Sequence, residues 1–192
     1  SLIFVGHMRV LHNVDAATHL ADDVLPLVQK EIPTCTLSIV GADPAPQIWE
    51  LGRSTSITVT GFVPDLNAHL NEAAGFVAPL RFAAGIQNKV LEAMAAGRPV
   101  DTTSLVNEGL GAQPEREILV ANDSASTAHQ ITRLLASEQF REQIGRAGRG
   151  FVMGKFGWHH AVERVRAIEE NLGPDQQRRL HRPGFPSGRN VL

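Results

Sequence analysis

The chain alternates short apolar runs with longer stretches in which apolar residues recur at the period of a helix. The short runs predict strands buried on both faces, because a strand open to water on one face alternates apolar and polar residues. The expected strands are 2–6, 35–41, 57–63, 75–80, 98–103 and 117–122, of which the last two have the weakest pattern. The expected helices are 13–32, 44–53, 65–73, 85–96, 125–136, 138–153 and 157–171.

Local signals mark where several helices begin and end. Asn13 and Asp65 are residue types that cap helix N-termini, so we expect each to cap the helix that follows it. Gly97 follows the helix at 85–96 as a C-terminal glycine does. Pro26 lies inside the stretch 13–32, and we expect it to bend or break that helix because proline has no backbone N–H.

The order of elements predicts the fold class. Strands that alternate with helices are joined by right-handed crossovers into a parallel sheet covered on both faces. We therefore expect an α/β domain of the open, Rossmann-like kind over residues 1–172. Residues 173–192 are basic, contain Pro and Gly and show no periodicity, so we interpret them as a tail outside the core. The chain enters a core strand at once without a methionine, and we expect it to be a domain of a longer protein.

Composition excludes several classes of protein. The net charge of −2 gives no strong attraction to nucleic acid or to an anionic membrane. The single cysteine, Cys35, excludes an internal disulfide and a zinc site built from cysteines. No segment approaches the roughly 20 apolar residues of a membrane helix. We expect a cytoplasmic protein, with at most peripheral association at the inner face of the membrane.

The segment GFVAPLRFAAGIQNKVLEAMAAGRPV (75–100) carries the candidate chemistry. Gly85, Asn88, Lys89 and Glu92 are spaced i, i+3, i+4 and i+7, so they share one face of the expected helix. The start of that helix lies beyond the carboxyl end of a strand, where open parallel sheets bind ligands and where helix N–H groups attract anions. A nucleoside diphosphate needs this pairing of a cation for the phosphates with a carboxylate for the ribose hydroxyls. The alternative interpretation is an ordinary surface pair worth a few tenths of a kcal/mol.

A series of motifs in order now indicates a family. GIQNKVLEAMAAGRPV resembles the donor-binding segment of family 4 glycosyltransferases, and more narrowly of the sugar transferases of exopolysaccharide and exosortase gene systems. FVGHMRVLHNVDAATHLADDVLPLVQKEIP is similar to the start of their C-terminal domain. LSIVGADP, ITVTGFVPDLNAHL, FVAPLR, ILVANDSASTAHQITRLL and KFGWHHAVERV follow in the family's order. The resemblance covers about residues 2 to 171 and rests on the succession of motifs.

The resemblance implies one half of a two-domain glycosyltransferase of the B-type fold, in which two Rossmann-like halves face a cleft. This chain is similar to the C-terminal half, which holds the nucleotide-sugar donor, a UDP- or GDP-sugar. The implied reaction moves the sugar, with retention of configuration, to a saccharide or lipid-linked acceptor held with the N-terminal half, in exopolysaccharide synthesis. No cofactor is implied, and we see no metal-ligand cluster in the sequence.

The resemblance also implies site residues. Lys89 and Glu92 are assigned the catalytic roles: Lys89 faces the diphosphate together with the amides of Gln87 and Asn88, and Glu92 holds the ribose. The turn after the first strand faces the diphosphate from the other side, and GFVPD (61–65) lines the base. The full nucleotide-sugar set is Gly6, His7, Met8, Phe62, Val63, Arg81, Gly85, Ile86, Gln87, Asn88, Lys89, Val90 and Glu92.

Three departures from the family pattern keep other functions open. Ala84 stands where the family has the first glutamate of a pair, and Asp101 stands where it has an apolar strand residue. We expect Asp101 to lie at an exposed edge or to be a peculiarity of this chain, since a buried unpaired aspartate is costly. The nearest candidate for the usual basic residue of the first loop is Arg9. The alternatives are a nucleotide-sugar epimerase of the same fold and a non-catalytic nucleotide-binding domain.

Structural roles are expected for the remaining conspicuous side chains. His159 and His160 are adjacent and point about 100° apart on a helix, so they are interpreted as surface residues. We expect Cys35 in the core and Trp49 packed with its helix. Phe156 and Trp158 are interpreted as a docking patch or a plug of the core.

Overall fold

The computed structural model describes residues 1–82 and 85–157. Ser1–Met153 form one compact unit, and Gly154–Leu192 form a second, of which only residues 154–157 are described. The expected helix at 157–171 therefore lies outside the described residues apart from its first position. Ala84, Trp158, His159 and His160, the boundary expected after residue 172 and the tail at 173–192 also lie outside them.

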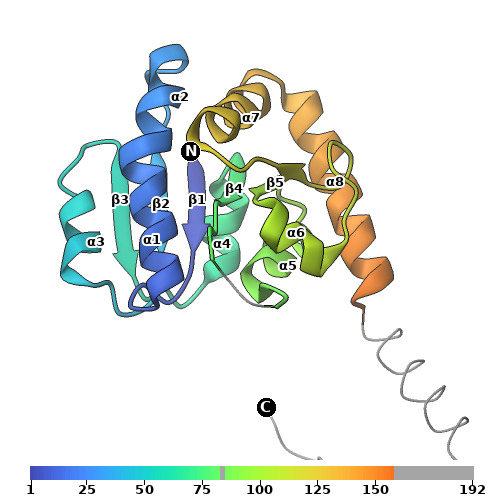
Figure 1. Ribbon diagram of the computed structural model, residues 1–192, viewed down its shortest axis with the longest axis horizontal. Helices are drawn as coiled ribbons and strands as arrows, with labels where there is room; N and C mark the ends of the chain where they lie inside the picture. The colour runs from blue at the N-terminus through green and yellow to red at the C-terminus, as the bar shows by residue number, and fades with distance from the viewer. Residues whose placement is uncertain (83–84, 158–192) are drawn as a thin grey trace, which may run out of the picture. The chain divides into compact units, whose positions relative to one another are not determined.

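The described residues form a parallel sheet in the order β3-β2-β1-β4-β5-β6 (Figure 1). Each neighbouring pair of strands is parallel, which confirms the expected α/β, Rossmann-like class. All expected strands are present, although each is shorter than its apolar run. Their bounds are β1 Leu2–Val5, β2 Leu37–Val40, β3 Ile57–Gly61, β4 Gly75–Ala78, β5 Val100–Thr102 and β6 Leu119–Val120.

The strand order reverses between β1 and β4. The chain moves outward from β1 through β2 to β3, returns to pair β4 with β1, and then moves outward the other way. Because such crossovers are right-handed, the helices of the two halves cover opposite faces of the sheet. The point of reversal leaves a crevice beyond the carboxyl ends of β1 and β4, which is where open α/β sheets bind ligands.

The helix expected at 13–32 is continuous, but it begins earlier than predicted. It consists of α1 (Leu11–His19), the π-helical turn η1 (Leu20–Val24) and α2 (Leu25–Glu31). The prediction that Asn13 caps it is wrong: Val10 is the N-cap residue, and Asn13 is buried inside the first turn. Pro26 does not break the helix either, because it lies in the first turn of α2, directly after the wider turn η1.

The other helices follow the predicted order. Their bounds are α3 Pro46–Leu51, α4 Leu66–Glu72, α5 Asn88–Ala95, α6 Ser104–Leu110, α7 Ser124–Ala136 and α8 Glu138–Lys155. Asp65 caps α4 as expected, since its side chain accepts from the Ala68 N–H at 3.1 Å. Gly97 has φ 73° just after α5, which confirms its predicted role at the helix end. α6 has no counterpart among the predicted elements.

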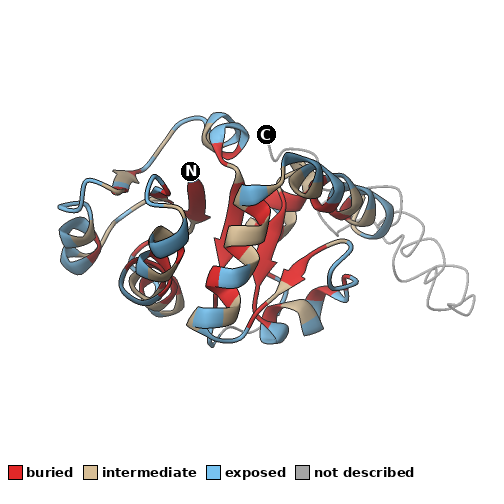
Figure 2. Ribbon diagram, turned by 90° about the horizontal axis from the view of Figure 1, so that it is seen from above, coloured by how far each residue is buried: buried red, intermediate tan, exposed pale blue. Residues whose placement is uncertain are grey.

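The core lies between the strands and the helices that cover them. Figure 2 shows the buried residues concentrated in the central strands, with the exposed residues on the outer faces of the helices. Phe4 on β1 and Phe76 on β4 are fully buried, and Cys35 is buried as expected. Trp49 on α3 is only partly packed: the residue is 49% exposed, and its ring lies beside Gly61. No helix among the described residues is long and apolar enough to cross a membrane.

The expectation that Asp101 lies at an exposed edge of the sheet is wrong. Its strand, β5, does not form the edge of the sheet, because β6 pairs with it and places Leu119 opposite Asp101. The side chain is 0% exposed, and neither carboxylate oxygen has a hydrogen-bond partner. Burial raises the pKa of Asp101 well above its usual range, and the charge of Glu115 adds to the effect. The folded chain thus buries a carboxyl group inside its sheet without a hydrogen-bond partner for either oxygen.

Candidate functional site at the carboxyl ends of the strands

The loop after β1 is fixed to the end of β2 by backbone contacts. Gly6 N–H donates to the Val40 carbonyl at 3.1 Å, and Met8 N–H donates to the Ala42 carbonyl at 2.9 Å. Gly41 permits this approach, since a Cβ on that residue would lie 1.7 Å from the Gly6 carbonyl oxygen. The two loops therefore form one rigid wall at the carboxyl edge of the sheet.

The segment after β4 leads into α5, and its helix starts later than predicted. The expected helix at 85–96 begins at Asn88, with Gln87 as its N-cap residue. Gly85 has φ 71°, a left-handed conformation that glycine adopts readily, so it lies in a turn before the helix. The prediction that Gly85 belongs to the polar helical face is wrong, while Asn88, Lys89 and Glu92 are helical.

These loops enclose a cavity of about 580 Å³ at the point where the strand order reverses. That volume lies within the roughly 300–1,000 Å³ of small-molecule sites. It receives residues from the ends of β1, β2 and β3 and from the start of α1, α4 and α5. The lining residues are Val5, Gly6, His7, Val10, His12, Asn13, Val40, Gly41, Ala42, Phe62, Val63, Leu66, Ile86, Gln87, Asn88, Lys89 and Glu92.

The structure brings most of the predicted site residues together at this cavity. Gly6, His7, Phe62, Val63, Ile86, Gln87, Asn88, Lys89 and Glu92 all line it.

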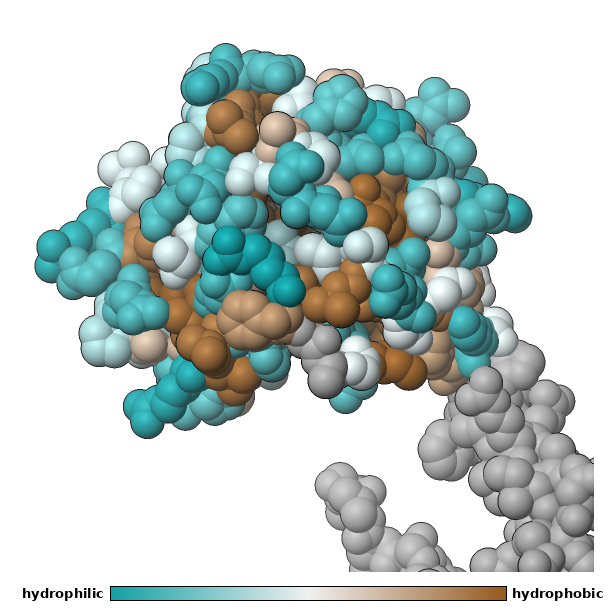
Figure 3. Space-filling model, in the orientation of Figure 1, coloured by the Kyte–Doolittle hydropathy of each residue, from teal (hydrophilic) through white to brown (hydrophobic). Residues whose placement is uncertain are grey.

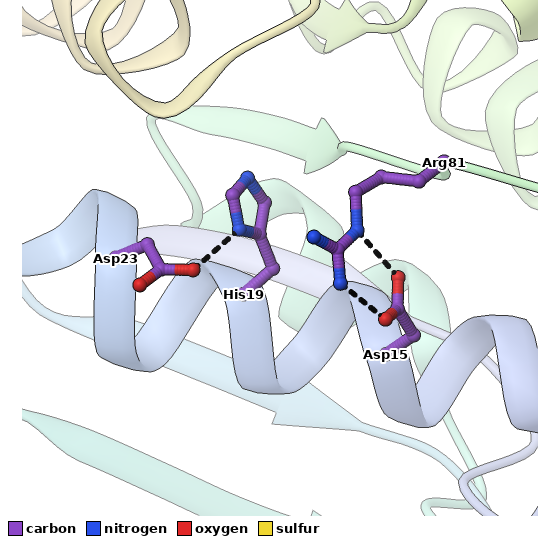
Figure 4. Close-up of polar contacts among 4 residues, drawn as sticks. All are labelled: Asp15, His19, Asp23 and Arg81. Carbon is purple, nitrogen blue, oxygen red and sulfur yellow. Dashed lines mark hydrogen bonds and ion pairs between the residues drawn. The ribbon is translucent and has the colours of Figure 1, made fainter.

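Four predicted residues lie elsewhere. Met8 and Val90 are fully buried in the core. Val90 occupies the face of α5 that packs on the sheet. Gly85 is exposed in its turn. Arg81 is exposed and binds Asp15 on α1, as Figure 4 shows.

Lys89 is the half-buried cation of the cavity. Its ammonium donates to Asn13 Oδ1 and lies 5.4 Å from the centre of the Phe4 ring. Burial lowers the pKa of Lys89 to about 8, because the interior solvates the charged form less well than water. The ion pairs among the described residues do not include one between Lys89 and Glu92, so the alternative of an ordinary surface pair is wrong.

Two histidines face the same cavity. The side chain of His7, with Nε2 at 3.3 Å from Asp43 Oδ2, is half exposed. His12 on α1 lies deeper, and burial lowers its pKa, with the nearby Lys89 charge acting in the same direction. No group of three or more His, Cys, Asp or Glu side chains in the described ranges is arranged to hold a metal ion.

Sequence reasoning missed part of the cavity wall. His12 drew no prediction, Asn13 was interpreted as a helix cap, and Gly41 and Ala42 follow a strand whose glycine is a weak signal by itself. The signal that could have found them is topology: residues that follow β1 and β2 must meet at the same edge of a parallel sheet.

Apolar side chains surround the mouth of the cavity. Among the lining residues, Phe62 is 76% exposed, and Val10 and Ile86 are also exposed. In the view of Figure 1 the strands run toward the lower edge, and Figure 3 shows brown, apolar side chains gathered over that lower part of the face. The cavity thus combines an apolar rim with one half-buried cation and one exposed carboxylate, Glu92.

Known proteins share this fold. The C-terminal domain of LpcC, a glycosyl transferase group 1 family protein from Francisella tularensis, matches with a TM-score of 0.60 and 17% identity, over 82% of this chain and 86% of that one. Two longer proteins match with one part of their length. TarM of S. aureus, crystallised with UDP and saccharides, gives a TM-score of 0.73 at 15% identity over 87% of this chain and 35% of its own. Anabaena HepE, crystallised with UDP and glucose, gives 0.69 at 14% identity over 89% and 48%.

Sequence comparison identifies the family. An uncharacterized 44.6 kDa protein in the cps region of Klebsiella pneumoniae is 26% identical over 140 residues, which are 68% of this chain and 36% of that protein. The present chain therefore spans about a third of the length of that relative. The family described as glycosyl transferases group 1 matches residues 1–137, which is more than half of the chain. The chain belongs to the glycosyl transferases group 1 family.

Proposed function

We propose that this chain is the donor-binding half of a glycosyltransferase that moves a sugar from a UDP- or GDP-sugar to a saccharide or lipid-linked acceptor, in exopolysaccharide synthesis. The observation that carries the proposal is the cavity at the strand-order reversal, with Lys89 and Glu92 from one helix on its wall. The UDP present in the TarM and HepE structures supports the donor class. The relative in the cps region of Klebsiella supports the link to polysaccharide.

In this proposal the diphosphate lies between the start of α5 and the loop after β1. The Lys89 ammonium and the positive end of the α5 dipole face it from one side, and the Gly6–His7 backbone approaches from the other. Both stabilise the negative charge that grows on the diphosphate as the bond to the sugar breaks, and they do so without rearrangement. Lys89 supplies a cation for this step from the protein itself.

Glu92 and the apolar wall hold the nucleoside in the same proposal. Glu92 lies one turn beyond Lys89 and is exposed, so its carboxylate is available to accept hydrogen bonds from the ribose hydroxyls. The backbone and side chains of Phe62 and Val63 form the wall against the base. The acceptor and the remaining catalytic groups belong, in this proposal, to an N-terminal half of the same protein, with at most peripheral attachment to the cytoplasmic face of a membrane.

One sequence feature favours a second candidate, a domain that binds the nucleotide without turnover. Ala84, outside the described residues, replaces a glutamate that the resemblance assigns to the donor sugar. This candidate keeps the diphosphate and ribose contacts and lacks only the contact with the sugar. The epimerase alternative receives no such support, because no observation on this cavity favours it over a transferase.

Calorimetric titration of the 192-residue chain with UDP, GDP, uridine and guanosine tests the proposal. One diphosphate should bind more tightly than its nucleoside, because Lys89 acts on the phosphates. A sugar contact would show as tighter binding of the matching nucleotide-sugar than of the free diphosphate. Equal affinities of the nucleotide-sugar and the diphosphate would favour the non-catalytic candidate. No binding of either diphosphate would contradict the proposed function.

A further inference from the structure

Asn13 connects two segments that are far apart in the sequence, the loop after β1 and the first turn of α5. Its side chain is enclosed, with 4% of the residue exposed. Its Nδ2 donates to the His7 carbonyl at 3.1 Å, and its Oδ1 accepts from the Lys89 ammonium, 76 residues further along the chain. One carboxamide therefore connects the loop after β1 to the first turn of α5.

The two partners determine how this carboxamide must lie. A backbone carbonyl can only accept a hydrogen bond, and an ammonium can only donate one. Asn13 must therefore direct its NH₂ group at His7 and its oxygen at Lys89. An aspartate in the same place could accept from Lys89 but would repel the His7 carbonyl, and a leucine of similar size could make neither contact.

Packing leaves the carboxamide no other place. A Cβ on Gly6 would lie 2.7 Å from Asn13 Cγ, so the glycine is what makes room for it. On the far side, the Lys89 ammonium lies over the buried Phe4 ring at 5.4 Å from its centre. Lys89 thus projects between a neutral oxygen and an aromatic face, which are both favourable to a cation.

We propose that Asn13 is a positioning residue of the nucleotide site, whose carboxamide holds the Lys89 ammonium and the Gly6–His7 loop together so that both face the diphosphate. The inference rests on the proposed function, because it gives Asn13 its role through Lys89 and not through chemistry of its own. The helix-cap role that the sequence predicts for Asn13 is not the one it performs.

The charged groups around Lys89 define what a substitution at position 13 would change. His12 approaches from α1 and Glu92 from α5 itself, and both line the same cavity. From the loops after β1 and β2 come His7 and Asp43, which contact each other at 3.3 Å. Asn13 is the neutral acceptor within this group. A carboxylate at position 13 favours the charged form of Lys89, whereas an apolar side chain there removes a hydrogen bond that favours it.

The first arm of the test measures Lys89 without any nucleotide. Acetylation of Lys89 by a limiting amount of reagent, followed by mass spectrometry, gives the midpoint pH at which the amine becomes reactive. The wild-type midpoint should lie at about 8. Asn13→Asp should raise it by about 1 pH unit or more, and Asn13→Leu should lower it. Asn71→Asp, at an exposed position at the end of α4, is the matched control and should leave the midpoint unchanged.

The second arm measures binding of UDP, GDP and their nucleosides to the same variants at pH 7. Asn13→Leu should lower the affinity for whichever diphosphate binds by about ten- to a hundredfold, as expected for a lost hydrogen bond in a charged network. It should change the affinity for the corresponding nucleoside by less than about twofold. Asn13→Asp should weaken the diphosphate as well, because it adds negative charge to the site. In a Lys89→Met background, Asn13→Leu should cause a smaller loss than in the wild type, because only its contact with the Gly6–His7 loop then remains to be removed. Thermal unfolding shows which variants fold. If Asn13→Leu does not fold, Asn13→Asp still tests the proposal.

The results of the two arms distinguish failure of the Asn13 proposal from failure of the proposed function. Equal midpoints in the wild type and both Asn13 variants would overturn the proposal, as would equal losses of nucleoside and diphosphate that persist in the Lys89→Met background. A wild-type chain that binds neither diphosphate would overturn the proposed function and the nucleotide role of Asn13 with it. Shifted midpoints would then still show that Asn13 controls Lys89, which distinguishes the two failures.

Discussion

Arg81 and Asp15 connect the segment after β4 to the middle of α1. Arg81 Nε donates to Asp15 Oδ2 at 2.9 Å, and Nη2 of the same guanidinium donates to Oδ1, so the contact is bidentate (Figure 4). The His19–Asp23 pair, at 2.7 Å, lies further along the same continuous helix, with His19 on α1 and Asp23 on η1. The Arg81–Asp15 pair holds the chain at the point where it leaves the sheet for the cavity.

Asp15→Asn should lower the free energy of unfolding slightly at neutral pH, and this difference from the wild type should disappear at acid pH. Hydrogen bonds from Arg81 lower the pKa of Asp15, and the charge of Arg81 adds to them. A lowered carboxyl pKa contributes stability above the unfolded value of 3.8, and this contribution disappears as pH falls through the folded value. Because Arg81 is half exposed, we expect a loss of at most about 1 kcal/mol at pH 7 by urea unfolding. An equal loss at pH 7 and at an acid pH where Asp15 is protonated in both the folded and the unfolded state would contradict this explanation.

Substitutions at Lys89 and Glu92 should affect different parts of the ligand. Lys89→Ala should weaken nucleoside diphosphate binding by about ten- to a hundredfold and the nucleoside far less, because the ammonium acts on phosphate charge. Glu92→Ala should weaken nucleoside and diphosphate alike, because both carry the ribose. A 2′,3′-dideoxynucleotide should bind poorly to the wild type and lose little more on Glu92→Ala. Calorimetry with these ligands measures all of these effects, and unchanged affinities throughout would remove both residues from the site.

Binding of the diphosphate should also depend on pH and on salt. The pKa of Lys89 is lowered to about 8, so in the free protein the ammonium loses its proton as pH rises through that value. Affinity for the diphosphate should therefore decrease above about pH 8 in the wild type but not in Lys89→Met. Added salt should reduce the advantage of the wild type if the cavity is open to solvent. A pH profile identical in both proteins would show that another group controls binding.

Asp101→Val should stabilise the fold at neutral pH. The raised pKa of Asp101 means that the folded state binds this proton more tightly than the unfolded state. The associated stability is complete below the unfolded value of 3.8 and is lost as pH rises through the folded value. Removing an unpaired buried polar group is worth about 1–3 kcal/mol. Thermal unfolding should show a higher Tm at pH 7–8 and a flatter pH profile, with Asp22→Val at an exposed position as the control.

Gly41→Ala should prevent the two loops of the cavity wall from meeting. The added methyl group would lie 1.7 Å from the Gly6 carbonyl oxygen, a backbone atom that cannot turn away. We expect a large drop in Tm or no folded protein. Gly150→Ala is the control, since a Cβ there meets nothing within 4 Å and alanine favours the surrounding α8. A Gly41→Ala variant as stable as the control would show that this wall is not rigid.

The fold could be predicted from sequence because its signals are local. Continuous apolar runs identify strands buried on both faces, and Asp65 and Gly97 each mark a helix end through their own backbone chemistry. The errors come from residues whose role is set by distant parts of the chain. Asn13 has the chemistry of a cap, yet its partners are His7 and Lys89, which only the folded sheet brings near.

In the candidate site, too, the features with a local sequence signal could be predicted, and those that depend on distant parts of the chain could not. The spacing of Asn88, Lys89 and Glu92 predicts a shared polar surface, and the structure places all three at the cavity. The helix start at Asn88 depends on the left-handed turn at Gly85, which no periodicity reveals. The burial of Asp101 depends on the short strand β6 pairing beyond it, which a weak apolar run cannot establish.

The measurement that tests the central claim most directly is a crystal structure of this chain soaked with UDP and, separately, with GDP. The account predicts that one of them occupies the cavity with its diphosphate within hydrogen-bond distance of the Lys89 ammonium and its ribose against Glu92. A nucleotide bound elsewhere, or bound in this cavity with its base at Lys89, would contradict the account.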